Sequence, residues 1–307
     1  IFYDKVVKYL IFGNVLKNNT YPLSVSAERI IQALEIVAYA KKIGASYIAH
    51  GSTGAGNDQV RFDMIFQILA PEIQIITPIR DLKLARQTEI DYLQANGVDY
   101  SWEKAKYSIN RGLWGTSIGG QETLRSKDPL PEEAYPSQLS ATEPRNIRLT
   151  FEKGELVALD GNKDLPVKNI EKLTEMASAY AIGRDIHVGD TIIGIKGRVG
   201  FEAPAPLIII KAHHLLEKHT LTKWQQFQKE NLGNWYGMML HEGNYLDEVM
   251  RNIEVFLQDT QRYVSGDVFV TLHSYRFTVN GIESGHDLMN SSFASYGESN
   301  EGWTAED

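Results

Sequence analysis

The sequence contains no cysteine among its 307 residues. This absence excludes a disulfide framework, a cysteine metal site and a thiol nucleophile, and it fits a reducing compartment. A basic excess is also absent, since 31 lysines and arginines against 39 aspartates and glutamates give a formal charge of −8. No apolar run approaches the roughly 18 residues of a membrane-spanning helix, and nothing at the start resembles a signal peptide. We therefore expect no nucleic-acid partner and no membrane partner.

The residues that are present are typical of a folded globular protein. Hydrophobic residues make up 43% and charged residues 23% of the chain, which are ordinary proportions. A length of 307 residues indicates one large domain or two ordinary ones. The chain starts at Ile1, inside an apolar periodic segment, so we expect further residues upstream in the complete protein.

Helical and strand patterns alternate in the first hundred residues. Apolar residues with a helical period at 27–43 precede Gly44, which is typical of a helix end. A second helix opens at Asn57 and stops at Pro71. The other expected elements are strands at 46–50 and 72–79 and a helix at 82–96. Strands separated by helices predict an α/β fold with a parallel sheet covered by helices.

The pattern changes near residue 100, where we place a boundary between domains at 1–100 and 101–307. Residues 101–147 are rich in glycine, serine and proline and are expected to form loops packed on a scaffold. Mixed α+β structure is expected beyond them, with hairpins at 148–159 and 268–279, helices at 166–181 and 247–261, a strand at 191–196, a strand turning into a helix within 207–229, and a polar tail at 291–307.

The sharpest local pattern is a glycine-rich loop at 51–56, between a predicted strand and a predicted helix. Backbone N–H groups in such a loop, and the positive end of the following helix, favour phosphate or carboxylate ligands. Thr53, Asn57 and Asp58 add polar side chains, and Arg61, one turn into the helix, suits a carboxylate. The alternative is a tight turn followed by an Asn or Asp helix cap.

The usual nucleotide-binding templates do not match this loop. A dinucleotide-binding fingerprint needs a third glycine where Gln59 stands. A P-loop ends in Gly-Lys-Ser or Gly-Lys-Thr, whereas Asn57 and Asp58 follow the last glycine here.

Two further patterns carry weaker signals. Residues 115–119 have the letters of a serine-hydrolase elbow, without the apolar strand before it and the helix after it. His213, His214 and His219 lack the spacing that would place metal ligands on one helix face. We predict no metal site.

Three stretches of the chain resemble signatures of the argininosuccinate synthase family. Residues 51–62 resemble the first signature, G-x-T-G-K-G-N-D-Q-V-R-F. Residues 107–117 resemble the second, and residues 183–202 resemble the third. The likeness extends over nearly the whole chain.

This resemblance implies an enzyme, an ATP-dependent C–N ligase. The family condenses citrulline with aspartate through a citrullyl-AMP intermediate and releases AMP and pyrophosphate, in arginine biosynthesis. The implied fold is a parallel-sheet nucleotide-binding domain of the adenine nucleotide alpha hydrolase type, followed by an α+β synthetase and multimerisation domain. ATP as a substrate with Mg²⁺, a homotetramer and a cytoplasmic location follow from the same resemblance.

The resemblance also implies substrate contacts at individual positions. Citrulline contacts are implied for Tyr21, Ser26, Asn57, Arg61, Ser108 and Ser117. Aspartate contacts are implied for Thr53, Asn57 and Asp58, and an ATP contact for Gly51. The residue types fit, because Thr and Asn donate hydrogen bonds to carboxylates and Asp accepts one from an ammonium group. Ser26 has a structural alternative as a helix cap.

The chain departs from the family pattern inside the expected site and at its ends. Ala55 stands where the family has Lys, which removes a cation near the nucleotide. Gly189 stands where the family has a citrulline-binding Glu, and Phe201 where it has Tyr, while Asp190 is a candidate replacement for the Glu. No Ser-Gly-Gly-x-Asp-x-Ser phosphate loop occurs, and we expect that loop and the family's C-terminal helix to lie outside this sequence.

Two other functions remain open at this point. The altered citrulline positions suit a related adenylating ligase with another ureido substrate, which a comparison of citrulline with close analogues would reveal. The absent phosphate loop suits a non-catalytic protein that binds aspartate or citrulline. Release of AMP that requires both amino acids separates the synthase from that binding protein, and the synthase is the function we predict.

Overall fold

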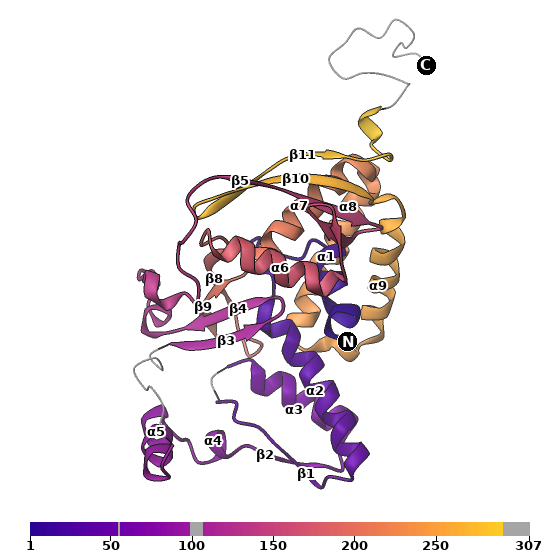
Figure 1. The fold of residues 1–307 in the computed structure, drawn as a ribbon. Coiled ribbons are helices and arrows are strands. Elements are labelled where there is room, and N and C mark those ends of the chain that lie inside the picture. The colour runs from indigo at the N-terminus through magenta and orange to yellow at the C-terminus, as the bar shows by residue number, and fades with distance from the viewer. Residues whose placement is uncertain (55, 99–106, 291–307) are drawn as a thin grey trace, which may run out of the picture.

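The computed structural model describes residues 1–54, 56–98 and 107–290. The strands form three sheets, and the helices lie beside and between these sheets (Figure 1). Within these ranges, no helix combines the length and the apolar character needed to cross a bilayer.

The first sheet has two short parallel strands, β1 (Tyr47–Ala49) and β2 (Gln74–Ile76). Along the chain, α2 (Ser24–Ile43) precedes these strands, α3 (Asp58–Leu69) separates them, and α4 (Pro78–Asp81) and α5 (Arg86–Ala95) follow them. Gly44 ends α2 in a left-handed conformation with φ 67°, as its position predicted. The strand expected at 72–79 is shorter than predicted, because Pro78 already starts α4.

The second sheet is antiparallel, and its strand order is β3-β4-β9-β8. Its strands are β3 (Ser108–Gly112), β4 (Gly115–Gly119), β8 (Arg184–Asp190) and β9 (Lys196–Glu202). The loops expected at 101–147 are wrong for β3 and β4, because β4 pairs with β9 and β3 pairs with β4 despite their small and polar residues. The strand expected at 191–196 is also wrong, because residues 191–195 turn between β8 and β9, with Ile193 and Ile195 about 60% exposed.

The third sheet is antiparallel and holds both hairpins that the sequence predicted. Its strands are β5 (Arg145–Glu152), β6 (Glu155–Leu159), β7 (Asn162–Lys163), β10 (Gly266–His273) and β11 (Arg276–Glu283). Helices α6 (Pro166–Ser178) and α7 (Pro204–Thr220) pack against it (Figure 1). The strand expected within 207–229 is wrong, because the β-branched run at 208–210 lies in α7, where all three residues are buried.

The start of the chain packs against its far end. A π-helical turn (Tyr3–Val7) leads into α1 (Lys8–Phe12), which contacts α7, α8 (Lys223–His241) and α9 (Glu248–Thr260). One hydrophobic core runs from Tyr3 to Leu272 and includes residues on both sides of position 100. Short 3₁₀ turns complete the described structure at Gln121–Leu124, Glu132–Ala134, Asn244–Leu246, Gln261–Tyr263 and Leu288–Asn290.

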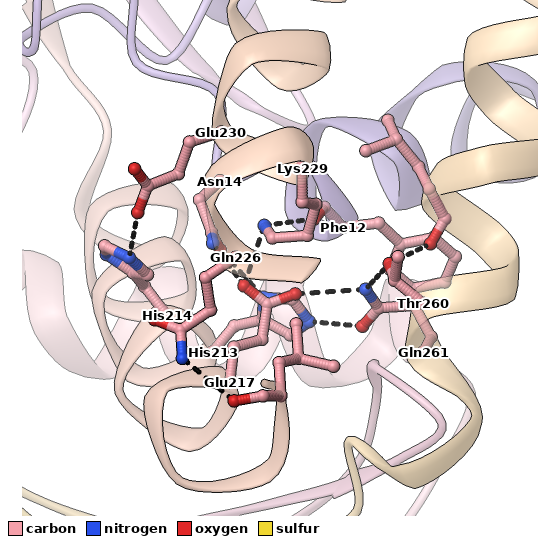
Figure 2. Close-up of polar contacts among 12 residues, drawn as sticks. Phe12, Asn14, His213, His214, Glu217, Gln226, Lys229, Glu230, Thr260 and Gln261 are labelled. Atoms are coloured by element: carbon pink, nitrogen blue, oxygen red, sulfur yellow. Dashed lines mark hydrogen bonds and ion pairs between the residues drawn. The ribbon is translucent and has the colours of Figure 1, made fainter. Parts of the chain in front are cut away.

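A buried polar network joins α1, α7, α8 and the turn after α9 (Figure 2). Lys229 Nζ lies 2.7 Å from Glu217 Oε2 and donates to the backbone oxygen of Phe12 at 2.7 Å. The side chains that complete the network are Asn14, His213 and Gln261. His213 therefore belongs to the core.

Candidate active site

A cavity of about 350 Å³ lies between the glycine-rich loop, the start of α2, the β8–β9 hairpin and the end of α8. Nine positions singled out in the sequence line it: Tyr21, Ser26, Thr53, Asn57, Asp58, Arg61, Ser117, Gly189 and Asp190. They come from four segments that are far apart along the chain. The fold thus brings the residues of the glycine-rich loop together with residues that only the resemblance had linked to them.

The start of α2 places Tyr21 and Ser26 in the cavity wall. Leu23 precedes the helix in a left-handed conformation, and the helix begins at Ser24. Ser26 is therefore not the helix cap, and its hydroxyl donates to the Leu23 carbonyl oxygen at 3.2 Å. The Tyr21 hydroxyl accepts a hydrogen bond from Ser24 at 3.1 Å, which fixes the tyrosine ring. Ser26 keeps free lone pairs that a ligand donor can use.

The glycine-rich loop leads into α3 through Asn57. Asn57 occupies the N-cap position of α3, as the alternative predicted, but its side chain forms no capping hydrogen bond. Its Oδ1 instead accepts a hydrogen bond from the Ile192 backbone N–H at 2.9 Å, which joins the loop to the β8–β9 turn. Gln59 Nε2 donates to the Gly54 carbonyl oxygen at 2.6 Å and closes the loop. Ala55, the departure expected to weaken nucleotide binding, lies outside the described residues.

Asp58 is held between two guanidinium groups. Its Oδ2 lies 3.0 Å from Arg29 Nε, and its Oδ1 lies 3.0 Å from Arg61 Nη1. Arg61 is only 2% exposed and also donates to the His241 carbonyl oxygen at 2.6 and 3.0 Å. Burial lowers the pKa of Arg61, while Asp58 acts in the opposite direction. Two cations against one carboxylate favour an anionic group, such as a substrate carboxylate, at this place.

Sequence reasoning missed Arg29. Besides Asp58, it donates to Asn110 Oδ1 at 3.1 Å, and Asn110 lies opposite Ser117 in the β3–β4 pair. Arg29 therefore links α2, α3 and β3 around the cavity. Its position three residues after Ser26, in a largely apolar helix, was the available signal.

Two histidines in the cavity wall were also missed. His241 Nδ1 lies 3.3 Å from Arg61 Nη2, and burial, helped by Arg61, lowers the pKa of His241 to about 3. His187 stacks on Tyr21 with 5.1 Å between ring centroids. Burial, helped by Lys17, lowers the pKa of His187 as well. Both rings are uncharged at neutral pH.

The β8–β9 hairpin carries the positions at which the sequence departs from the family pattern. Gly189 and Asp190 line the cavity, but Asp190 Oδ1 lies 2.6 Å from Lys196 Nζ, and the Asp190 side chain is 59% exposed. Phe201 is fully buried and packs on Tyr21 with 5.4 Å between centroids. Phe201 therefore supports the wall from behind and does not line the cavity.

Two predicted contact residues are not among those that line the cavity. Gly51 is exposed in the loop after β1. Ser108 is exposed on β3, opposite Gly119, two residues before Asn110. Their ATP and citrulline contacts remain predictions.

No cluster of three or more His, Asp or Glu side chains suited to a metal ion occurs in the described part of the chain. His213 is enclosed in the core network. His214 pairs with Glu230, and His219 pairs with Asp287.

Comparisons with known proteins match both parts of the chain that form the cavity. A family model described as the arginosuccinate synthase N-terminal HUP domain matches residues 2–99, and one described as the arginosuccinate synthase C-terminal domain matches residues 107–305. The argininosuccinate synthase of Methanocaldococcus jannaschii is 36% identical over 301 residues, covering 96% of this chain and 76% of the relative.

Two further relatives give the same picture. The argininosuccinate synthase of Dictyoglomus turgidum is 38% identical over 287 residues, covering 92% of this chain and 72% of the relative. That of Sulfolobus acidocaldarius is 34% identical over 307 residues, covering 100% of this chain and 78% of the relative. These matches confirm the resemblance seen in the three signatures, and the chain belongs to the argininosuccinate synthase family.

Proposed function

We propose that the cavity between the glycine-rich loop and the β8–β9 hairpin is where this ligase holds citrulline and aspartate. The activity of the family is the ATP-dependent condensation of these amino acids through citrullyl-AMP, with release of AMP and pyrophosphate, in arginine biosynthesis. The chain is accordingly an ATP-dependent ligase rather than a non-catalytic binding protein. The observation that carries the placement is the convergence of nine expected positions on one cavity.

The charges in the cavity support a division of roles. Asp58 is proposed to accept a hydrogen bond from the aspartate ammonium group, with Thr53 and Asn57 donating to its carboxylates. Citrulline is proposed to contact Tyr21, Ser26, Asn57, Arg61, Ser117 and Ser108. Gly51 is proposed to lie against ATP, whose Mg²⁺ would be held mainly by phosphate oxygens and water.

In this reaction the residues of the cavity mainly position the substrates and form no covalent bond with them. The ureido oxygen of citrulline attacks the α-phosphorus of ATP, and pyrophosphate leaves. The aspartate nitrogen then attacks the ureido carbon, and AMP leaves with the oxygen. Holding the two amino acids in one cavity converts an encounter of separate molecules into a local reaction, which accounts for much of the rate gain in such enzymes. Arg29 and Arg61 supply fixed positive charge beside the anionic reactants.

Further features of the protein are part of the same proposal. Residues 1–100 form the nucleotide-binding domain, and the parallel pairing of β1 with β2 supports the expected parallel sheet. Residues 101–307 form the synthetase and multimerisation domain. A homotetramer in the cytoplasm is the assembly that the family resemblance supports.

Replacement of Asp58 tests the placement of aspartate. Asp58→Asn leaves Arg29 and Arg61 without their shared carboxylate and removes the partner of the substrate ammonium group. Hydrogen bonds to charged groups contribute about 1.5–3 kcal/mol, so we expect the KM for aspartate in an AMP-release assay to rise by roughly 10- to 100-fold.

The control is Asp91→Asn, an exposed position on α5 that contacts Gln87. This variant should match the wild type, and AMP should appear only when citrulline and aspartate are both present. An unchanged KM for aspartate in Asp58→Asn would remove Asp58 from the site.

A further inference from the structure

His187 is a largely buried polar side chain that faces the cavity. It projects from β8, is 5% exposed and lines the cavity. Neither of its ring nitrogens bonds to a residue in the ranges that the structure describes. The buried side-chain atoms that lack any partner in the described ranges do not include either nitrogen of His187, so these nitrogens are open to the cavity. Polar atoms that line a cavity and form no hydrogen bond inside the protein are available to a ligand.

His241, the other histidine of the wall, shows the opposite arrangement. Its Nδ1 lies against Arg61, and it also interacts with the Asp190 backbone. Its polar atoms are thus used inside the protein. The contrast singles out His187 as the histidine whose polar atoms remain available to a ligand.

The position of the His187 ring depends on Gly189. A Cβ atom added at position 189 would lie 2.5 Å from His187 Nε2 and 3.0 Å from its Cε1. Gly189 does not adopt a left-handed conformation, so the backbone itself does not demand glycine there. The missing side chain at 189 is what leaves room for the imidazole at the cavity wall.

The surroundings of His187 favour a neutral ligand group. His187 stacks on the face of the Tyr21 ring, and burial, helped by Lys17, lowers the pKa of His187 and disfavours a protonated ring. A neutral imidazole offers one donor and one acceptor. A ureido group is also neutral and offers both N–H donors and a carbonyl acceptor, whereas an ammonium or a carboxylate is better matched by Asp58 or Arg61.

We propose that His187 is a substrate-binding residue that forms a hydrogen bond with the ureido group of citrulline, in the space that Gly189 leaves open. This inference rests on the proposed function of the cavity. It makes the pair of His187 and Gly189 a determinant of specificity for a ureido substrate.

The test compares two ligands in NMR titrations of the purified protein. Citrulline carries the ureido group, and norvaline keeps the amino-acid end and the carbon chain but lacks it. We expect His187→Ala to weaken citrulline binding by roughly 3- to 10-fold, the effect of one neutral hydrogen bond. Norvaline binding should stay within about twofold. His187→Gln, which keeps a donor and an acceptor, should recover most of the loss, and His286→Ala, an exposed control, should change neither ligand.

A second variant tests the steric part. Gly189→Ala should displace the ring and weaken citrulline binding in the wild-type background, and it should have little effect when His187 is already Ala. Equal weakening of citrulline and norvaline, or unchanged citrulline binding in His187→Ala, would overturn the inference and leave the proposed function standing. Failure of the wild-type protein to bind citrulline would overturn the proposed function itself.

Discussion

Arg61 and its neighbours show how single residues tie the candidate site to the core. Arg61 contacts Asp58 through one nitrogen and the backbone and ring of His241 through the others. Arg29 holds Asp58 from the opposite side. Because these charges are partly or fully withdrawn from water, each depends on the others, and loss of one leaves its partner poorly solvated.

The low pKa of His241 predicts a pH-dependent stability. Its pKa is about 3 in the folded protein against 6.5 for an ordinary histidine. The unfolded chain therefore binds the proton more strongly, so stability is full above pH 6.5 and falls as the pH drops from 6.5 towards 3. Between pH 7 and pH 5 this residue should cost about 2 kcal/mol of the free energy of unfolding, since one pKa unit corresponds to about 1.4 kcal/mol.

Urea unfolding of the wild type and of His241→Gln at both pH values measures this contribution. Other groups titrate over the same range, and the comparison with the variant removes them. The variant should lose about 2 kcal/mol less than the wild type on acidification. Identical losses in the two proteins would show that His241 is protonated equally in the folded and unfolded states.

Helices and hairpins with strong local signals could be predicted from the sequence. Gly44 ends α2, α3 stops before Pro71, and Asp247 starts α9 by accepting a hydrogen bond from Val249 N–H at 3.0 Å. The β5–β6 hairpin turns at 153–154, where the sequence has Lys-Gly. Each of these signals lies within a few residues of the structure it specifies.

Elements that depend on distant partners could not be predicted in this way. Strands β3 and β4 have few apolar residues and exist because β9 pairs with β4. The isoleucines at 192–195 suggested a strand, yet they form a turn held by Asn57 from another part of the chain. The same limit applies to the site, where a contiguous motif revealed Asn57 and Asp58, while His187 and His241 required the fold.

The buried network around Lys229 should dominate the stability of the helical part. Burial alone would raise the pKa of Glu217, but Lys229 and then His213 lower it overall, so Glu217 is an anion that needs its partner. Lys229→Met should therefore reduce the free energy of unfolding by about 3–5 kcal/mol in urea denaturation.

Two comparisons make this prediction specific. The double variant Glu217→Gln with Lys229→Met removes both charges and should be more stable than Lys229→Met alone. Lys168→Met removes an exposed lysine that lies 2.7 Å from Glu171, and it should cost less than about 1 kcal/mol. A loss in Lys229→Met as small as that in Lys168→Met would contradict the role given to the network.

At the scale of the whole molecule, the cavity joins the two halves of the chain. One wall comes from residues before position 100, and the other comes from β4, the β8–β9 hairpin and the end of α8. The hydrophobic core is likewise shared, because α1 packs against α7, α8 and α9. The site is therefore built by the complete fold, and its geometry depends on contacts between residues more than one hundred positions apart.

A crystal structure of the protein grown with citrulline and aspartate tests the central claim most directly. We predict that both amino acids occupy the cavity, with the ureido group of citrulline within hydrogen-bond distance of His187 and the aspartate ammonium group near Asp58. Ligands bound elsewhere on the molecule, with this cavity filled only by water, would contradict the account.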